Sequence, residues 1–221
     1  MEVKVVQNVM AANDLLAKEL REAFNRNKNF VINFLSSPGA GKTSLLEETI
    51  KRLKRNLRIA VVEGDIVGDQ DARRIAALDI PAVQINTGGT CHLDARMVKS
   101  ALPELDLTKV DLLFVENVGN LICPASFKLG EDLRVVLLST PEGNDKVKKY
   151  PLAFRESQAV VINKIDLLGA VDFDVEQARS DVQDINPRSE LFVVSCKTGE
   201  GMGSWVDYLK GKVLGSARRA G

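Results

Sequence analysis

The stretch FVINFLSSPGAGKTSLL (30–46) decides the fold of this chain. Its apolar first part, FVINFL (30–35), is followed by a turn with two glycines and then by a helical pattern. The turn satisfies the pattern GxxxxGK[ST] at Gly41, Lys42 and Thr43, with Ser36 where the first glycine usually stands. A strand before this turn and a helix after it are the context that a phosphate-binding loop requires, and they disfavour a chance glycine-rich turn.

The residue types of this loop suit the binding of a nucleotide triphosphate. Gly39 and Gly41 let backbone N–H groups turn towards phosphate oxygens without a clashing Cβ, and the helix that follows adds partial positive charge at its N-terminus. We expect Lys42 to reach the β- and γ-phosphates and the Thr43 hydroxyl to ligate Mg²⁺. The nucleotide-binding residues predicted in this loop are Ser37, Pro38, Gly39, Ala40, Gly41, Lys42, Thr43 and Ser44.

Six more short apolar runs follow the first, and helix-length segments separate most of them. Nearly continuous hydrophobic strands that alternate with helices predict a mostly parallel sheet, of about seven strands, covered by helices on both faces. Together with the phosphate loop, this pattern predicts an α/β fold of the P-loop NTPase class. The six runs are LRIAVVEG (57–64), PAVQIN (81–86), DLLFVEN (111–117), LRVVLLST (133–140), AVVINK (159–164) and ELFVVS (190–195).

The predicted domain spans residues 30–214, with a helical extension over 1–29 and a tail over 215–221. Within the extension, residues 7–27 carry apolar positions among charged neighbours, which indicates an amphipathic helix docked on the domain. These positions are Val9, Leu15, Leu16, Leu20 and Phe24.

The composition excludes several classes of protein. The formal net charge is zero, which argues against a nucleic-acid binder that works by bulk electrostatics. No apolar run approaches the ~20 residues of a membrane span, and the N-terminus lacks the plan of a signal peptide. The three cysteines are widely spaced and odd in number, which suits a reducing cytoplasm better than a disulfide framework. We therefore expect a cytoplasmic protein that binds neither nucleic acid nor membrane.

Two further elements continue the nucleotide site. In DLLFVENVG (111–119), an apolar strand ends in Glu116 and Gly119 follows three residues later, where such folds hold Mg²⁺ and sense the γ-phosphate. Asp65 follows the second strand and is predicted to ligate Mg²⁺ or orient the attacking water, with Glu63 as a weaker candidate. The alternative for Asp65 is a loop acid or a helix cap. The predicted catalytic residues are Lys42, Thr43, Asp65 and Glu116, and Thr43, Asp65 and Glu116 are the predicted Mg²⁺ ligands.

The tetrapeptide NKID (163–166) predicts recognition of guanine. Asp166 can accept hydrogen bonds from the guanine N1–H and N2–H₂, Asn163 can bond the ring edge, and the stem of Lys164 can pack over the base. The segment Ser195-Cys196-Lys197 follows the last strand and is typical of a loop that closes over the guanine O6, so Cys196 is interpreted as a packing residue. GTP and GDP are the expected nucleotides.

Hydrolysis of that GTP is expected to be slow. The residues around Gly119 are Asn117, Val118 and Asn120, so no glutamine is placed beside Gly119 to orient a water, and no arginine finger is evident. A slow intrinsic rate suits a switch more than a metabolic enzyme.

A rare residue pair, Cys91-His92, points to a metal. His92 is the only histidine of the chain, and the pair follows the third predicted strand, while Cys123 follows the strand that ends in Glu116. The carboxyl ends of parallel strands meet at one edge of the sheet, so these three side chains can converge beside the nucleotide. Two sulfurs and an imidazole suit Ni²⁺ or Zn²⁺, and the alternative is a buried cysteine with a capping histidine. Three ligands leave the shell open to a water or to a second copy of the chain across a twofold axis.

The chain resembles the HypB family of nickel-incorporation GTPases that mature [NiFe]-hydrogenases. The resemblance covers nearly the whole chain, and its specific part is TCHLDA (90–95) with NLICP (120–124), which generic P-loop GTPases lack. It implies GTP-favoured homodimerisation and a metal site of Cys91, His92 and Cys123 at the dimer interface. It also implies that nickel is delivered together with a metallochaperone of the HypA type to a hydrogenase large-subunit precursor.

Other functions remain open on the sequence. Urease-linked or cobalamin-linked delivery GTPases share the same general plan. A plain regulatory GTPase would carry Cys91 and Cys123 on its effector surface without binding metal. A small-molecule P-loop kinase is disfavoured by NKID (163–166).

Overall fold

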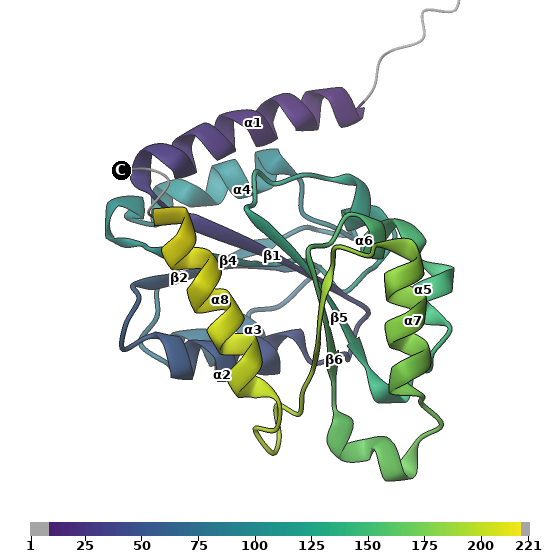
Figure 1. Ribbon diagram of the computed structural model, residues 1–221. Helices are drawn as coiled ribbons and strands as arrows, with labels where there is room; N and C mark the ends of the chain where they lie inside the picture. The colour runs from purple at the N-terminus through teal and green to yellow at the C-terminus, as the bar shows by residue number, and fades with distance from the viewer. Residues whose placement is uncertain (1–8, 218–221) are drawn as a thin grey trace, which may run out of the picture.

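The computed structural model describes residues 9–217, and its centre is one sheet of seven strands (Figure 1). The strand order is β3-β2-β4-β1-β5-β6-β7, and every neighbouring pair is parallel. All seven predicted runs form strands, so the expected parallel α/β architecture is confirmed. The strands are β1 (Phe30–Ser36), β2 (Ile59–Asp65), β3 (Ala82–Asn86), β4 (Leu112–Glu116), β5 (Leu133–Ser139), β6 (Ala159–Asn163) and β7 (Glu190–Val193).

The strand that precedes the phosphate loop, β1, lies in the middle of the sheet between β4 and β5. Each of its residues is buried, as are those of β5, which explains why these runs are mostly apolar rather than alternating. The buried polar exceptions are Asn33, Ser36, Arg134 and Ser139. Because all strands run in the same direction, the loops after β1, β2, β3, β4, β6 and β7 leave from one edge of the sheet. This edge carries every candidate site residue of the sequence.

One face of the sheet is covered by helices α2 (Lys42–Leu53), α3 (Gln70–Ala76) and α8 (Met202–Ala217) (Figure 1). Their apolar side chains form a core with β1, β2 and β4, in which Trp205 and Ile50 are fully buried. The Trp205 indole N–H donates to the Thr49 hydroxyl at 2.9 Å, so α8 is fixed to the helix that begins at the phosphate loop.

The opposite face is covered by two groups of helices. Helices α1 (Val9–Asn27) and α4 (Ala95–Ala101) pack over the β2-β4-β1 half, and α6 (Pro151–Arg155) and α7 (Val175–Ile185) pack over the β5-β6 half (Figure 1). The short helix α5 (Lys146–Lys149) precedes α6. Five 3-10 turns complete the described secondary structure: Leu102–Glu104, Leu107–Lys109, Cys123–Ser126, Thr140–Glu142 and Ile165–Ala170.

Helix α1 is attached to the domain by its buried side. Leu20 and Phe24 are buried in the core, but Leu15 is 68% exposed, so its predicted place on the apolar face is wrong. Leu15 lies two residues after the buried Asn13, and two helical positions are 200° apart, which places it on the far side. Asn13 accepts from the Ala95 N–H at 2.8 Å and donates to the Lys128 carbonyl at 2.9 Å. The side chain of Val9 and residues 7–8 of the predicted helix lie outside what the structure describes.

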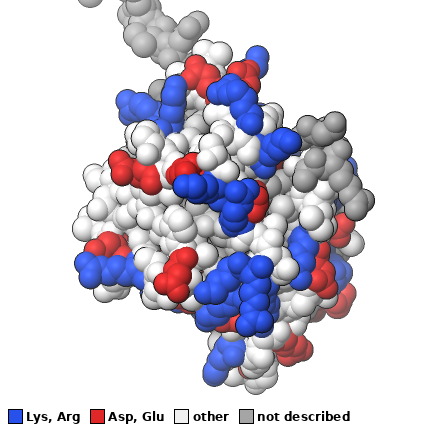
Figure 2. All heavy atoms as spheres, turned by 90° about the vertical axis from the view of Figure 1, so that its left-hand side faces the viewer, with Lys and Arg blue, Asp and Glu red and all other residues white. Residues whose placement is uncertain are grey.

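Helix α8 continues to Ala217, past the start of the tail predicted at residue 215, while residues 218–221 lie outside the described part of the chain. Across residues 9–217, no helix has the length and apolarity needed to cross a bilayer. On the face shown in Figure 2, lysine and arginine side chains are interspersed with aspartate and glutamate. Opposite charges on the surface also form ion pairs, such as Arg58–Asp111 at 2.6 Å.

Candidate functional site

The loop between β1 and α2 has the backbone of a phosphate-binding loop. Gly39 and Gly41 adopt left-handed conformations with φ of 77° and 96°, which other residues rarely adopt. At Gly41 a Cβ would also come within 2.6 Å of the Asn163 side-chain nitrogen. Gly41 therefore has to be glycine both for its backbone and because the predicted guanine motif packs directly against it.

The polar side chains of the loop are already arranged around a common point. The Lys42 ammonium donates to the Ser36 hydroxyl at 3.2 Å and lies 3.8 Å from Glu116 Oε1. The Thr43 hydroxyl donates to the same Glu116 oxygen at 3.0 Å. Ser36, at the place of the usual first glycine, thus contributes a hydroxyl as well as a small side chain.

Glu116 has a second carboxyl group beside it. Parallel pairing of β2 with β4 places Glu63 directly opposite Glu116, and both side chains are buried. Burial, and then the charge of Glu116, raise the pKa of Glu63 to about 11, and burial also raises the pKa of Glu116. Among the described residues, neither Glu63 Oε1 nor Glu116 Oε2 finds a hydrogen-bond partner. Two such oxygens beside the Thr43 hydroxyl are the donor set that Mg²⁺ prefers, so the residues fit this ion.

Asp65 lies differently from Glu63. Its side chain is exposed, and its Oδ1 accepts from the Ile66 N–H at 2.7 Å, in the manner of a loop acid. It still lines the same cavity, which has a volume of about 550 Å³. The structure therefore places both acids at the site, with Glu63 in the interior and Asp65 near the solvent.

Three polar side chains that line this cavity are not indicated by the sequence motifs: Asp71, Arg74 and Gln84. Gln84 pairs with Glu63 in the register of β3 and β2, so Gln84, Glu63 and Glu116 form a row across three strands. Arg74 forms a fork with Glu47 at 3.0 and 2.8 Å, and also contacts Asp71. The alternation of side chains along 82–86 predicts on which face of the sheet Gln84 lies. Only the register between β3 and β2 shows that its neighbour is Glu63.

The residues of the guanine motif converge at the other end of the phosphate loop. Asn163 donates to the Ala40 carbonyl at 3.1 Å and accepts from the Cys196 N–H at 3.2 Å. The Lys164 ammonium donates to the Gly39 carbonyl at 2.7 Å, and the Ser195 hydroxyl donates to Asp166 Oδ1 at 2.6 Å. The three segments that carry Gly41, Asn163 and Cys196 are thus in direct contact.

A cavity of about 420 Å³ lies beside these residues, and its wall includes Asp166, Cys196 and Lys197. Asp166 Oδ1 is fixed by Ser195, which leaves the carboxylate oriented for a further donor. Burial raises the pKa of the Cys196 thiol to about 12, and its side chain packs against the core under α8. This placement fits the interpretation of Cys196 as a packing residue.

The remaining predicted residues of the phosphate loop lie in or beside the first cavity, of about 550 Å³. Pro38, Ser44 and Gly119 line it. Ala40 is fully buried, and the Ser37 carbonyl accepts from the Ser36 hydroxyl at 2.7 Å. At Gly119 a Cβ would lie 3.1 Å from Pro38, so the segment after Glu116 passes close to the phosphate loop.

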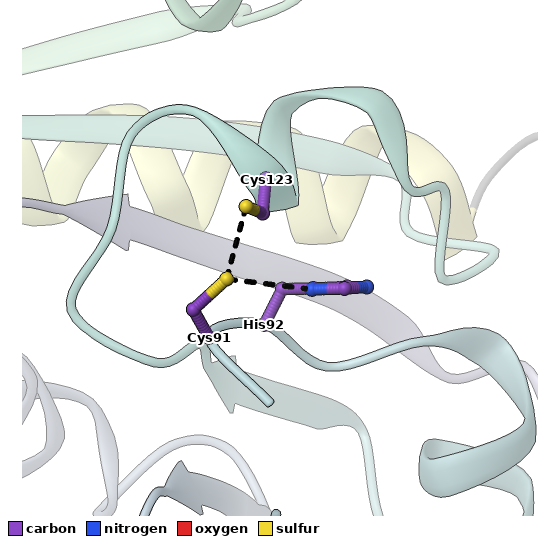
Figure 3. Close-up of side chains that lie close together, drawn as sticks. All are labelled: Cys91, His92 and Cys123. Carbon is purple, nitrogen blue, oxygen red and sulfur yellow. Dashed lines mark hydrogen bonds between the residues drawn. The ribbon is translucent and has the colours of Figure 1, made fainter. Parts of the chain in front are cut away.

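Cys91, His92 and Cys123 form one cluster, as Figure 3 shows. The two sulfurs lie 2.9 Å apart, Cys91 Sγ is 4.0 Å from His92 Nδ1, and all the potential ligand atoms lie within 4.8 Å of one another. Both cysteines are free thiols. Burial lowers the pKa of His92, which favours the neutral imidazole that binds metals. The strand order predicts that these three side chains converge, and they do so in the structure.

The loop that carries Cys91 and His92 is held by the segment that follows Glu116. The Asn120 side chain donates to the Cys91 carbonyl at 3.3 Å, and the Leu93 N–H donates to Asn117 Oδ1 at 2.9 Å. Leu93 itself packs on Gly64, where a Cβ would lie 2.6 Å from Leu93 Cγ. The sulfur and imidazole cluster is therefore joined through hydrogen bonds to the residues next to the phosphate loop.

Comparison with known proteins agrees with this geometry. The family description "CobW/HypB/UreG, nucleotide-binding domain" matches residues 30–193. The chain is 49% identical over 208 residues to the hydrogenase maturation factor HypB of Azotobacter vinelandii, covering 94% of this chain and 69% of the relative.

Two solved structures are similar over nearly the whole chain. The HypB structure from Archaeoglobus fulgidus has a TM-score of 0.86 and 42% identity, covering 92% of this chain and 99% of that one. The HypB structure from Helicobacter pylori in complex with nickel has a TM-score of 0.88 and 40% identity, covering 92% and 95%. These likenesses confirm the predicted P-loop NTPase fold.

Proposed function

The chain belongs to the HypB branch of the CobW/HypB/UreG family of nucleotide-binding proteins, and on that premise we propose that it is a GTP-hydrolysing metallochaperone that delivers nickel during [NiFe]-hydrogenase maturation. One observation carries the proposal. The Cys91-His92-Cys123 cluster lies at the same edge of the sheet as the phosphate loop, and Asn117 and Asn120 join the two. A change in the bound nucleotide could therefore move the residues that hold the metal.

The nucleotide half of the proposal rests on the two cavities. Asp166 would accept from the N1–H and N2–H₂ of guanine, donors that adenine does not present in this pattern, and Lys42 would contact the β- and γ-phosphates. Thr43 and Glu116 would hold a magnesium ion together with Glu63 on the interior side and Asp65 on the solvent side, and the bound ion would neutralise phosphate charge. Arg74 lines the cavity, but its guanidinium is paired with Glu47 and Asp71 and is therefore not free to contact the phosphates as an arginine finger. Slow intrinsic hydrolysis is therefore expected.

In the metal half, nickel is cargo and not a resident cofactor. The sulfurs of Cys91 and Cys123 and the imidazole of His92 would bind Ni²⁺, and the same donors suit Zn²⁺. Thiols this close remain unbridged in a reducing compartment such as the cytoplasm. Three ligands leave a coordination position open. A homodimer favoured by GTP would fill it from a second copy, and a HypA-type metallochaperone and a hydrogenase large-subunit precursor would give and receive the metal.

The test combines nucleotide chemistry with metal stoichiometry. Phosphate release from GTP and from ATP is measured in water without an added acceptor, which separates a GTPase from a kinase. Nickel binding is then measured for wild type and for the Cys91→Ser/Cys123→Ser double variant, with Cys196→Ser as the control. We expect GTP-selective release, and nickel binding that is lost only in the double variant. Phosphate release without nickel binding would leave a plain regulatory GTPase.

A further inference from the structure

A buried ion pair lies next to the metal-binding cluster. Arg134, in β5, and Glu131, just before it, have side chains only 5% and 8% exposed. The Arg134 Nη2 and Nε atoms donate to Glu131 Oε1 at 2.6 and 2.9 Å. Burial acts to raise the pKa of Glu131, but the charge of Arg134 and the backbone N–H groups outweigh it, and the net pKa is lowered. The carboxylate therefore stays ionised.

Arg134 uses its remaining N–H groups on the turn that carries Cys123. Nη1 donates to the Ala125 carbonyl at 2.7 Å, and Nη2 donates to the Phe127 carbonyl at 2.9 Å. The Phe127 ring in turn packs on the His92 ring, with 4.0 Å between centroids. One guanidinium therefore fixes both the turn of Cys123 and the aromatic surface on which His92 lies.

The loop of Cys91 and His92 is tied to the same ion pair from the other side. Asn117, which is 1% exposed, accepts from the Leu93 N–H and donates to Asn33 Oδ1 at 3.3 Å. Asn33 donates to Glu131 Oε1 at 3.4 Å. Asn117, Asn33, Glu131 and Arg134 thus form a continuous buried polar network, which begins at the loop of Cys91 and ends at the turn of Cys123.

The energetics of burial favour a positional role over a stabilising one. A buried ion pair loses much of its attraction to desolvation, and apolar residues of similar volume are often equally stable in its place. What an apolar replacement lacks is direction, because it does not fix the carbonyls of Ala125 and Phe127 at set positions. Metal affinity is highest when the loops that carry the ligands already hold them at the separation that the metal requires. If the loops must move on binding, the cost of that movement weakens the affinity.

We propose that Arg134, Glu131, Asn33 and Asn117 are positioning residues for the nickel-binding cluster. Through hydrogen bonds they hold the loop of Cys91 and His92 and the turn of Cys123 at one fixed separation. The inference rests on the proposed nickel site and adds the residues that set its geometry. None of the four touches the ligand atoms, so each acts through the backbone that carries them.

The experiment measures nickel affinity by competition with a chromophoric chelator, and the nickel–thiolate charge-transfer absorption of the bound ion. The variants are Arg134→Lys, which keeps the charge and loses the fork, and Glu131→Gln, which keeps the shape and loses the charge. Asn186→Ala is the matched control, because Asn186 also donates to three carbonyls of a turn, those of Phe154, Arg155 and Ser157, on the α6–α7 side. Urea unfolding and GDP affinity are measured for all of them.

We expect nickel affinity to fall about 10- to 100-fold in both network variants, the usual effect of losing an outer partner of a metal ligand. We also expect the charge-transfer band to shift in both network variants while their GDP affinity stays unchanged. In Asn186→Ala the band should not shift. Should Arg134→Lys fail to fold, Glu131→Gln alone decides the question. Unchanged affinity and spectrum in a folded network variant would overturn the inference, as would an equal loss in Asn186→Ala. Absence of nickel binding by wild type would instead refute the proposed function.

Discussion

The sulfurs of Cys91 and Cys123 lie 2.9 Å apart although 32 positions separate them in the chain. This distance is longer than the ~2.05 Å of a disulfide bond, so the two residues face each other as thiols. Cys91 follows β3 and Cys123 follows β4, and β2 lies between those strands in the sheet. The two loops therefore meet above the end of β2, next to the segment that carries Glu63 and Asp65.

Nickel is expected to protect two of the three cysteines from alkylation. Cys91 and Cys123 would become metal thiolates, whereas Cys196 is half-buried and its pKa, raised by burial to about 12, keeps it protonated and slow to react at pH 8. Iodoacetamide labelling followed by peptide mass spectrometry checks this. Without nickel, Cys91 and Cys123 are labelled, and with nickel they are spared, while the labelling of Cys196 does not depend on nickel. Equal labelling of both in the two samples would argue against a thiolate site.

Asp166→Asn is expected to weaken guanine nucleotide binding by at least about 10-fold, because hydrogen bonds to a charged acceptor are lost. The new amide can donate to the 2-oxo group of xanthine, so the affinity for xanthosine diphosphate should rise relative to GDP. Displacement of a fluorescent nucleotide measures both affinities. Asp172→Asn, at an exposed position nearby, is the control. A variant that keeps its guanine preference would show that another residue reads the base.

Glu63→Gln is expected to flatten the pH dependence of stability in the protein without Mg²⁺ and nucleotide. Burial, and then the charge of Glu116, raise the pKa of Glu63 to about 11, from the 4.5 of an ordinary glutamate. Between these values the native state holds a proton that the unfolded state has released, so the free energy of unfolding falls as pH rises. Glutamine removes this proton linkage. Thermal unfolding from pH 5 to pH 9 tests the prediction, with the exposed Asp65→Asn as control, and parallel curves for wild type and Glu63→Gln would contradict it.

Asn13→Ala is expected to lower the free energy of unfolding by about 1–3 kcal/mol, because the Ala95 N–H and the Lys128 carbonyl lose a buried partner. Leu15→Ala, on the exposed side of the same helix, should change it by less than about 0.5 kcal/mol. Chemical denaturation of the two variants gives the comparison. Similar small effects would mean that α1 is only loosely attached to the domain.

The strands and the phosphate loop could be predicted because their signals are local. A run such as 133–139 is mostly apolar and does not alternate with polar residues, and Gly39 and Gly41 mark a turn that few other residues form. The meeting of Cys91 and Cys123 could also be predicted, since strand direction alone brings their loops to one edge. Each of these inferences needs only the order of elements along the chain.

What could not be predicted depends on register and on side-chain direction. The sequence favours Asp65 over Glu63 as an Mg²⁺ ligand because Asp65 comes at the end of the strand, yet the pairing of β2 with β4 sets Glu63 opposite Glu116 in the interior. From the sequence, Leu15 belongs to the apolar side of the helix. In the structure the buried Asn13 shows which side of α1 faces the domain, and Leu15 lies on the opposite side. Arg134 reads as an ordinary charge near a strand start, and only the fold shows that it supports the turn of Cys123.

If nucleotide and nickel act on each other in this protein, its nickel affinity depends on which nucleotide is bound. Competition with a chelator is carried out in GDP and in a non-hydrolysable GTP analogue, for wild type and for Cys91→Ser/Cys123→Ser. We expect the nickel affinity of wild type to differ between the two nucleotide states by about 5-fold or more, the range of typical coupling between sites, and the double variant to lose both nickel binding and this difference. Equal nickel affinity of wild type in the two states would contradict it.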